Sequence, residues 1–144
     1  NYLNMFYIGQ VLHHKKRKKI TSVDHKNFNK MTRNNHPIHS NLKNAKKTFF
    51  KKRLVNGTFV FSLIVGLSVE EFSKKCVANL EYRNIRHLSP VFEGDILNAK
   101  TKILHIKKLK NNRLNVGVIT FGFNQKKKKV LSLERIARFN QEDI

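Results

Sequence analysis

The chain has 144 residues, of which 30 are Lys or Arg and 9 are Asp or Glu, so its formal net charge is +21. This length fits one domain around a single core and argues against two domains. The charge would suit nucleic acid, an anionic membrane surface or a phosphorylated ligand. However, the basic runs are scattered along the chain, and such runs usually form a solvated surface.

Cys76 is the single cysteine of the sequence, which excludes an internal disulfide and a thiol cluster for zinc. No secretory signal is recognised, and the most apolar run, residues 59–67, is far shorter than the roughly 20 residues that span a bilayer. We therefore expect no membrane span, a reducing compartment and a cytoplasmic location, or the mitochondrial matrix in a eukaryote.

The elements expected in the first third of the chain are short. Residues 7–12 have the pattern of an opening strand, and residues 18–21 close this strand or its partner. A helix is predicted over residues 22–31, because Thr21 or Ser22 is in position to cap its N-terminus.

The segment TRNNHPIH, residues 32–39, follows as a shaped loop, since Pro37 disfavours a helical conformation at His36. Residues 40–47 are compatible with another short helix. A turn at residues 56–58 then leads into a helix over residues 57–73, which is apolar on nearly all sides and is therefore expected to be buried on most faces.

The apolar spacing changes to strand-like runs in the second half, which are residues 77–88, 96–104, 114–123 and 130–139. With the N-terminal strand they predict an antiparallel sheet of about five strands. One buried helix followed by such a meander indicates an α+β protein of the hot-dog fold, in which the sheet wraps around the helix. The prediction is a single domain over residues 1–144.

Several chemistries find little support in the residues. His13, His14, His36 and His39 could supply imidazoles, but no suitably spaced carboxylate or thiolate accompanies them, so no metal site is predicted. Cys76 is interpreted as a packing residue. The sequence contains no glycine-rich phosphate loop and no nucleic-acid recognition motif, so nucleic-acid binding stays an alternative that rests on charge alone.

His39 is the strongest single candidate for chemistry. It ends the proline-shaped loop, which can hold its ring in one orientation, and an imidazole exchanges protons near neutral pH. A histidine at this position could equally cap the next helix or hydrogen-bond a turn. Considered by itself, the loop leaves both readings open.

Five segments occur in an order and spacing that resemble the MaoC-like hydratase family, which includes the R-specific enoyl-CoA hydratases. They are Tyr7-Ile8-Gly9-Gln10, Ile20-Thr21 with Asp24 and Phe28, Asn34-Asn35-His36-Pro37-Ile38-His39, Arg53-Leu54-Val55-Asn56-Gly57, and Ser89-Pro90-Val91-Phe92-Glu93-Gly94-Asp95. The resemblance covers about residues 7–139. It implies the hot-dog fold and the addition of water to, or its removal from, an acyl-CoA thioester.

The sequence departs from the family pattern at two positions. The family loop Asp-x-Asn-Pro-x-His supplies a catalytic Asp and His, and His39 matches the His while Asn34 stands at the Asp position. The family pattern Val-His-Gly is Val55-Asn56-Gly57 here. Both changes are similar to the branch of mesaconyl-CoA hydratases (β-methylmalyl-CoA dehydratases), so mesaconyl-CoA is the substrate that the resemblance suggests.

The resemblance implies a set of site residues. His39 would be the acid and base, and Asn34 would orient a water molecule, because an amide does not titrate near neutral pH. The thioester oxygen would bind at the start of the central helix, at the backbone N–H groups of Gly57 and Thr58, beside Asn56 and the hydroxyl of Ser62.

Lys51, Lys52 and Arg53 precede this turn and are candidates to contact the phosphates of coenzyme A, although a solvated face is the more ordinary role for them. No cofactor is expected beyond the coenzyme A of the substrate, and the resemblance implies at least a homodimer. A protein that binds acyl-CoA or nucleic acid without catalysis remains the alternative, because Asn34 could mark a lost activity.

Overall fold

The structure is a computed structural model, and it describes residues 6–40 and 53–144. The elements in chain order are β1 (Val11–His13), β2 (Lys18–Lys19), α1 (Ser22–Met31), α2 (Pro37–Ser40), α4 (Gly57–Leu67), a π-helical turn η1 (Val69–Ser73), β3 (Ala78–His87), β4 (Ile96–Leu109), β5 (Arg113–Phe123), β6 (Lys129–Asn140) and a short 3₁₀ helix η2 (Gln141–Asp143).

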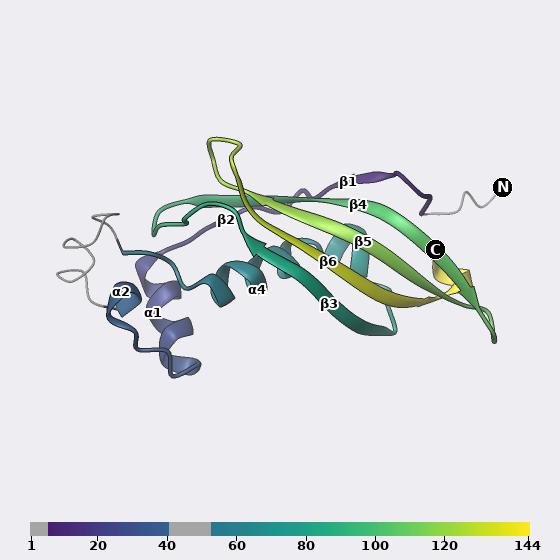
Figure 1. Cartoon of the computed structure of the whole chain (residues 1–144), viewed down its shortest axis with the longest axis horizontal. Coiled ribbons are helices and arrows are strands. Elements are labelled where there is room, and N and C mark those ends of the chain that lie inside the picture. Colours follow the sequence, from purple (N-terminus) through teal and green to yellow (C-terminus); the bar gives the residue numbers. More distant parts are fainter. Residues whose placement is uncertain (1–5, 41–52) are drawn as a thin grey trace.

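A six-stranded antiparallel sheet dominates the molecule (Figure 1). Its strand order is β1-β4-β5-β6-β3, and β2 also pairs with β4. The sheet curves along α4, while α1 and α2 lie at one end of the molecule, beyond the sheet (Figure 1). The predicted hot-dog arrangement is confirmed, and β2 adds a sixth strand to the five that were expected.

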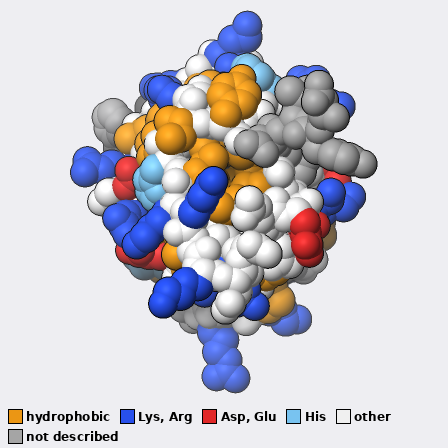
Figure 2. Space-filling model, turned by 90° about the vertical axis from the view of Figure 1, so that its right-hand side faces the viewer, with side chains coloured by type: hydrophobic (Ala, Val, Ile, Leu, Met, Phe, Trp, Pro, Cys, Tyr) orange, Lys and Arg blue, Asp and Glu red, His pale blue; other side chains and the backbone are white. Residues whose placement is uncertain are grey.

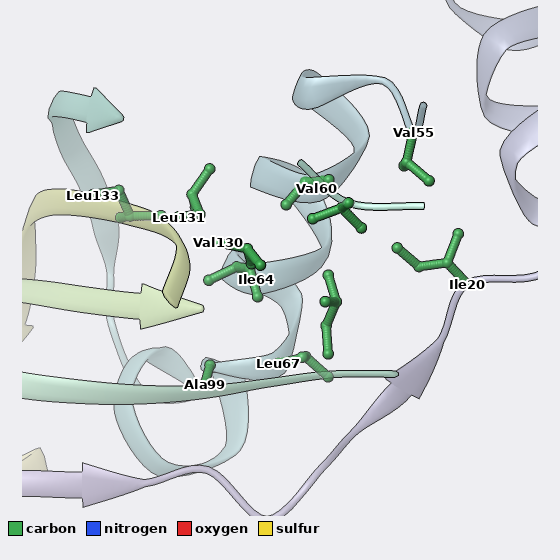
Figure 3. Close-up of a cluster of buried hydrophobic side chains, with 11 residues drawn as sticks. Ile20, Val55, Val60, Ile64, Leu67, Ala99, Val130, Leu131 and Leu133 are labelled. Atoms are coloured by element: carbon green, nitrogen blue, oxygen red, sulfur yellow. The ribbon is translucent and has the colours of Figure 1, made fainter. Parts of the chain in front are cut away.

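The core lies between α4 and the concave face of the sheet (Figure 3). Val60, Ile64 and Leu67 are spaced by one helical turn and are the buried side chains of α4. Ile64 fits against the backbone of β5 at Gly122, where an added Cβ would lie 2.6 Å from the Ile64 Cδ1 atom. Burial of each of these side chains contributes about 1.5–3 kcal/mol, which anchors the helix to the sheet.

The central helix differs from the prediction in length. It ends at Leu67, where the hydroxyl of Ser68 donates to the Val65 carbonyl oxygen at 2.6 Å, and the chain continues into η1. Thr58, Ser62 and Gly66 are the exposed residues of α4, while Phe61 and Leu63 are partly buried and pack against the core. The expectation of a helix that is buried on most faces is confirmed.

The N-terminal strand is shorter than predicted. Strand β1 covers Val11–His13, and the residues before it form a turn in which the Gln10 N–H donates to the Tyr7 carbonyl oxygen at 3.1 Å. Gly9 lies in this turn with φ of +87°, a left-handed conformation that glycine adopts without steric cost.

The predicted loop over residues 32–39 contains a helical turn. Pro37 is the first residue of α2, a position where proline is favoured because its fixed φ suits a helix and its missing N–H would have no partner there. His39 therefore sits on a helical turn, and not in an extended loop. The helix predicted over residues 40–47 lies, after Ser40, outside the described residues.

Basic side chains are dispersed over one face of the molecule. On the face shown in Figure 2, Lys and Arg side chains stand apart from one another, with polar and apolar side chains between them. None of the helices in the described parts of the chain is both long enough and apolar enough to cross a membrane.

Candidate active site

A buried histidine links α1 to the residue that precedes α4. The side chain of His25, on α1, is fully buried. Its Nδ1–H donates to Glu93 Oε1 at 2.8 Å, and its Nε2 accepts the backbone N–H of Asn56 at 3.0 Å. Because Nε2 accepts a hydrogen bond, it cannot carry a proton, and His25 is therefore neutral in this arrangement. Burial lowers the pKa of His25, in agreement with the geometry.

Glu93 joins three segments that are distant in sequence. Besides His25, its carboxylate accepts the Ser22 hydroxyl at 2.8 Å and Arg53 Nη1 at 3.2 Å. Burial opposes ionisation of this carboxylate, but the hydrogen bonds from His25 and Ser22 and the charge of Arg53 outweigh it and lower the pKa of Glu93. The network thus fixes the chain just before α4 against α1.

Asn56 is the N-cap of α4 and is buried. Its Oδ1 accepts both the backbone N–H and the hydroxyl of Thr58, at 3.0 and 2.8 Å, and its Nδ2 donates to Asn29 Oδ1 at 3.1 Å. The Thr58 N–H is therefore already paired, which corrects its predicted role as an oxyanion donor. Among the described residues the Gly57 N–H has no partner, so it remains as the donor of the first helical turn.

His39 is held in one orientation by the backbone. Its Nδ1–H donates to the Leu54 carbonyl oxygen at 2.7 Å, which leaves Nε2 without its proton in the neutral ring and able to accept one. The His39 ring lies 6.0 Å from the His25 ring and 5.8 Å from the His36 ring, measured between centroids. The contact with Leu54 thus fixes the ring of His39, and its role as acid and base stays a prediction.

A cavity of about 390 Å³ brings His39 and Gly57 together. Most of its wall is apolar and comes from the segment before α4, from α4 itself and from the Ser89–Val91 region, with Val60, Val91 and Val130 among the contributors. His87, the last residue of β3, also lines it. Ser62 is exposed on α4 and takes no part in this wall, so its predicted contact with the thioester is not supported here.

A second cavity of about 590 Å³ lies on the other side of His39 and is strongly basic. Asn34 contributes to its wall, and Asn34 Oδ1 accepts the His36 N–H at 3.2 Å. Four cationic side chains surround the same space, namely Lys26, Lys30, Arg33 and Arg53. His39 lines both cavities, so a molecule that reaches His39 can occupy either one or both.

Arg33 holds an unusual backbone conformation beside this basic cavity. It follows α1 with φ of +59°, in the left-handed region that usually takes glycine or asparagine after a helix. Arg53, the third predicted phosphate contact, pairs with Glu93 and lines the cavity. The other two, Lys51 and Lys52, lie outside the described residues.

Sequence reasoning missed His25 and His87. His25 falls inside the predicted helix with no local sign that it is buried against Glu93, and His87 lies on a strand far from the loop. Glu93 belongs to the segment PVFEGD, which is part of the resemblance to the MaoC-like hydratases. The sequence did not indicate which side chains Glu93 contacts.

A second buried pair, His14 with Glu71, attaches η1 to the residue after β1. His14 Nδ1 lies 2.9 Å from Glu71 Oε2, and His14 Nε2 lies 2.7 Å from Thr101 Oγ1. Burial lowers the pKa of His14 and outweighs the raising effect of Glu71. Burial opposes ionisation of Glu71, but the backbone N–H of Lys15 and the His14 ring outweigh it, so the pKa of Glu71 is also lowered.

These two pairs predict that acid destabilises the fold in a defined window. The pKa values of His14 and His25 are lowered from 6.5, so below that pH the unfolded chain binds more protons than the folded chain. Stability is then complete above pH 6.5 and falls as the pH drops below it. The pKa values of Glu71 and Glu93 are lowered from 4.5, so a further loss follows as the pH falls below 4.5.

Urea unfolding followed by circular dichroism at about pH 8, 6, 5 and 4 measures this dependence. The midpoint is expected to decline between about pH 6.5 and 5, before most carboxylates titrate. A midpoint that stays constant down to about pH 5 would contradict the assignment of neutral, buried histidines.

Known proteins are similar to this chain in sequence and in fold. The chain is similar to the mesaconyl-CoA hydratase of Cereibacter sphaeroides, with 37% identity over 90 residues that cover 62% of this chain and 26% of that protein. It is similar to the β-methylmalyl-CoA dehydratase of Chloroflexus aurantiacus, with 24% identity over 144 residues, 99% of this chain and 41% of that protein. The chain thus spans between about a quarter and two fifths of the length of these two relatives.

The fold is also similar to that of the (R)-hydratase from A. caviae, with a TM-score of 0.80 and 21% identity over 93% of this chain and 97% of that one. The family model described as "MaoC like domain" matches residues 5–121, which is most of the sequence. The chain belongs to the MaoC-like domain family.

Proposed function

We propose that this protein is a hydratase or dehydratase that adds water across, or removes it to form, the double bond of an α,β-unsaturated acyl-CoA thioester. One observation carries the proposal: His39, with Nδ1 anchored on the Leu54 carbonyl oxygen, lines the same apolar cavity as Gly57 at the start of α4. An oriented base and a free backbone donor beside an apolar cavity are what this reaction needs. The names of the curated relatives support the same reaction class.

In the hydration direction the thioester carbonyl is polarised at Gly57. The N–H of Gly57 is the donor of the first turn of α4 that has no partner among the described residues, and it lies at the positive end of that helix. Negative charge builds up on the thioester oxygen as water attacks Cβ. The Gly57 N–H stabilises that charge.

His39 Nε2 takes the proton of the attacking water as its oxygen bonds to Cβ. The electrons of the double bond move to the thioester as an enolate, which takes a proton at Cα from a second, protonated group of the cavity. In the reverse direction the conjugate base of that group removes the Cα proton, and protonated His39 gives its proton to the departing hydroxyl, which leaves as water. Asn34 does not titrate near neutral pH, so it serves in orienting water, and histidine carries the proton transfer.

The acyl group that we propose carries a negative charge of its own, as mesaconyl-CoA does. The basic cavity, with Lys30, Arg33 and Arg53 around it, adjoins the apolar cavity at His39 and suits a carboxylate at the far end of a short acyl chain. Arg33 keeps a left-handed conformation while its side chain lines this space, which supports a role for that position. Both curated relatives are named for substrates of this kind.

A homodimer is part of the same proposal. Strand β3 is at the edge of the sheet and exposes apolar side chains along its length, including Leu80, Tyr82 and Ile85. Phe61 of α4 contacts Tyr82 with ring centroids 5.2 Å apart and is itself only half-buried. A second copy that covers this strand would bury both, and light scattering should then give twice the chain mass of 16.9 kDa.

The test follows the absorbance of the enoyl thioester with crotonyl-CoA and mesaconyl-CoA, for the natural chain and for Asn34→Asp. We expect the natural chain to hydrate mesaconyl-CoA with the higher kcat/KM. In Asn34→Asp a carboxylate replaces the amide at the position of the family Asp, so crotonyl-CoA hydration should rise by about 10-fold or more. An equal or lower rate with Asn34→Asp would show that this position does not separate the two activities.

The alternative functions predict other outcomes for the same preparation. If no enoyl thioester is consumed but acyl-CoA binds in calorimetry, the protein is a binder without catalysis. If DNA or RNA binds with an affinity that falls steeply with salt while no thioester reacts, the function is nucleic-acid binding, in keeping with the net charge of +21.

A further inference from the structure

We propose that His87 is a second catalytic histidine, which exchanges the proton at the substrate Cα. This inference rests on the proposed hydratase function and assigns a residue that lies outside the segments of the family pattern. It concerns the apolar cavity, in whose wall His87 meets His39 and Gly57.

The His87 ring packs directly on Gly57. A Cβ built on Gly57 would lie 2.8 Å from His87 Cε1 and 3.0 Å from His87 Nε2. Any side chain at position 57 would therefore collide with the ring, so the contact with His87 requires glycine at this position. The thioester oxygen that binds at the Gly57 N–H is two bonds away from Cα, which brings Cα close to the His87 ring.

The cavity has a shortage of groups that can transfer protons. His39 and His87 are the titratable side chains in its wall among the described residues, and no carboxylate lines it. Asn34, at the position of the family Asp, belongs to the basic cavity and cannot take up a proton near neutral pH. A hydration needs a base for the water at Cβ and an acid for Cα, and the two imidazoles supply one of each.

The proton balance closes with these two groups. Neutral His39 takes a proton from water as the C–O bond forms at Cβ, and the double-bond electrons become the enolate. The protonated His87 then gives its proton to Cα, which forms the C–H bond and restores the thioester carbonyl. His87 is exposed, so it regains a proton from solvent while His39 releases one, and the enzyme returns to its starting state.

The chain offers a matched control for the packing of a ring on glycine. On the opposite part of the sheet, His105 of β4 covers Gly117 of β5, where an added Cβ would lie 2.1 Å from His105 Cε1. His105 is exposed, as His87 is, and it lies outside both cavities at His39. Replacing each histidine by phenylalanine keeps a ring over the glycine and removes the proton.

The experiment measures kcat for the hydration of mesaconyl-CoA and crotonyl-CoA against pH in the natural chain, His87→Phe, His87→Gln and His105→Phe. A base that must be neutral and an acid that must be protonated give a bell-shaped profile. We expect kcat to fall by about 100-fold in both His87 variants, with loss of the alkaline limb of the bell, and to stay unchanged in His105→Phe.

Two results would overturn the assignment. One is turnover by His87→Phe and His87→Gln within about 3-fold of the natural chain. The other is a lower rate whose pH profile still has its alkaline limb, which would mean that His87 only covers Gly57. Thermal unfolding of each variant identifies a folding defect. If His87→Phe has such a defect, turnover by His87→Gln decides whether His87 is catalytic. If the natural chain itself hydrates no enoyl thioester, the proposed function fails together with this inference, whereas normal turnover in the variants refutes the role of His87 alone.

Discussion

Replacing His39 by alanine should lower kcat for enoyl-thioester hydration by at least about 100-fold. The Nε2 atom of His39 is the base that faces the apolar cavity, because Nδ1 is occupied by the Leu54 carbonyl oxygen at 2.7 Å. Without it, water at Cβ has no group to take its proton. KM should change little, since the apolar wall and Gly57 remain in place.

His36→Ala is the contrast for this variant, since His36 is the other histidine of the same segment and its ring lies 5.8 Å from that of His39. We expect it to keep turnover within a few-fold of the natural chain, because His36 lines neither cavity. Removing the His39 ring also removes one hydrogen bond, which costs about 1 kcal/mol of stability and leaves the fold intact. Near-natural turnover in His39→Ala would refute its role, and an equal loss in His36→Ala would move the base to His36.

Replacing His25 by alanine should have the largest effect on stability. The change leaves a cavity and breaks two hydrogen bonds, so the Asn56 N–H loses its acceptor and the Glu93 carboxylate loses a buried donor. The two lost hydrogen bonds and the cavity left by the ring together cost about 3–5 kcal/mol. Urea unfolding should therefore show a lower midpoint, and the melting temperature should fall by about 10 °C.

His13→Ala serves as the control, because His13 is exposed on β1 and a surface substitution usually changes stability by less than about 0.5 kcal/mol. The His25 variant should also lose activity while it is still folded, since its contact with Asn56 positions the turn that carries Gly57. A loss of stability below about 1 kcal/mol would mean that His25 is not the buried link between α1 and α4.

Much of the fold follows from the spacing of apolar residues. The runs in the second half of the sequence alternate as half-buried strands do, and they became β3 to β6 with boundaries close to those expected. The cap of α1 at Thr21 was also predictable, because its side chain accepts the Asp24 N–H at 3.0 Å within four residues. Local periodicity and local capping are properties of short segments, which a single sequence displays.

Features that depend on contacts between distant segments were not predictable. Arg135 falls in a predicted strand, yet it is almost fully buried, with its guanidinium over the Phe72 ring and one nitrogen donating to Ser68. Ser68 is the C-cap residue of α4, so a strand far along the chain contacts the end of the central helix. The sequence pattern shows no reason for a charged side chain to lie there.

The site itself was predictable in part. His39 and Gly57 were expected to cooperate, and the structure brings both into one cavity, although their catalytic roles stay predictions. Thr58 was wrong as a donor because the N-cap residue Asn56 uses its N–H, a local effect that the sequence already allowed. His87 could not be foreseen, because it reaches Gly57 only through the pairing of β3 with β6.

The most direct test of the proposed hydratase activity is the rate at which the purified chain consumes an enoyl-CoA thioester, measured in parallel with its His39→Ala variant. We expect steady loss of mesaconyl-CoA or crotonyl-CoA absorbance with formation of the hydroxyacyl product, and a rate at least about 100-fold lower for the variant. No consumption of either thioester by the natural chain, or the same rate with and without His39, would contradict it.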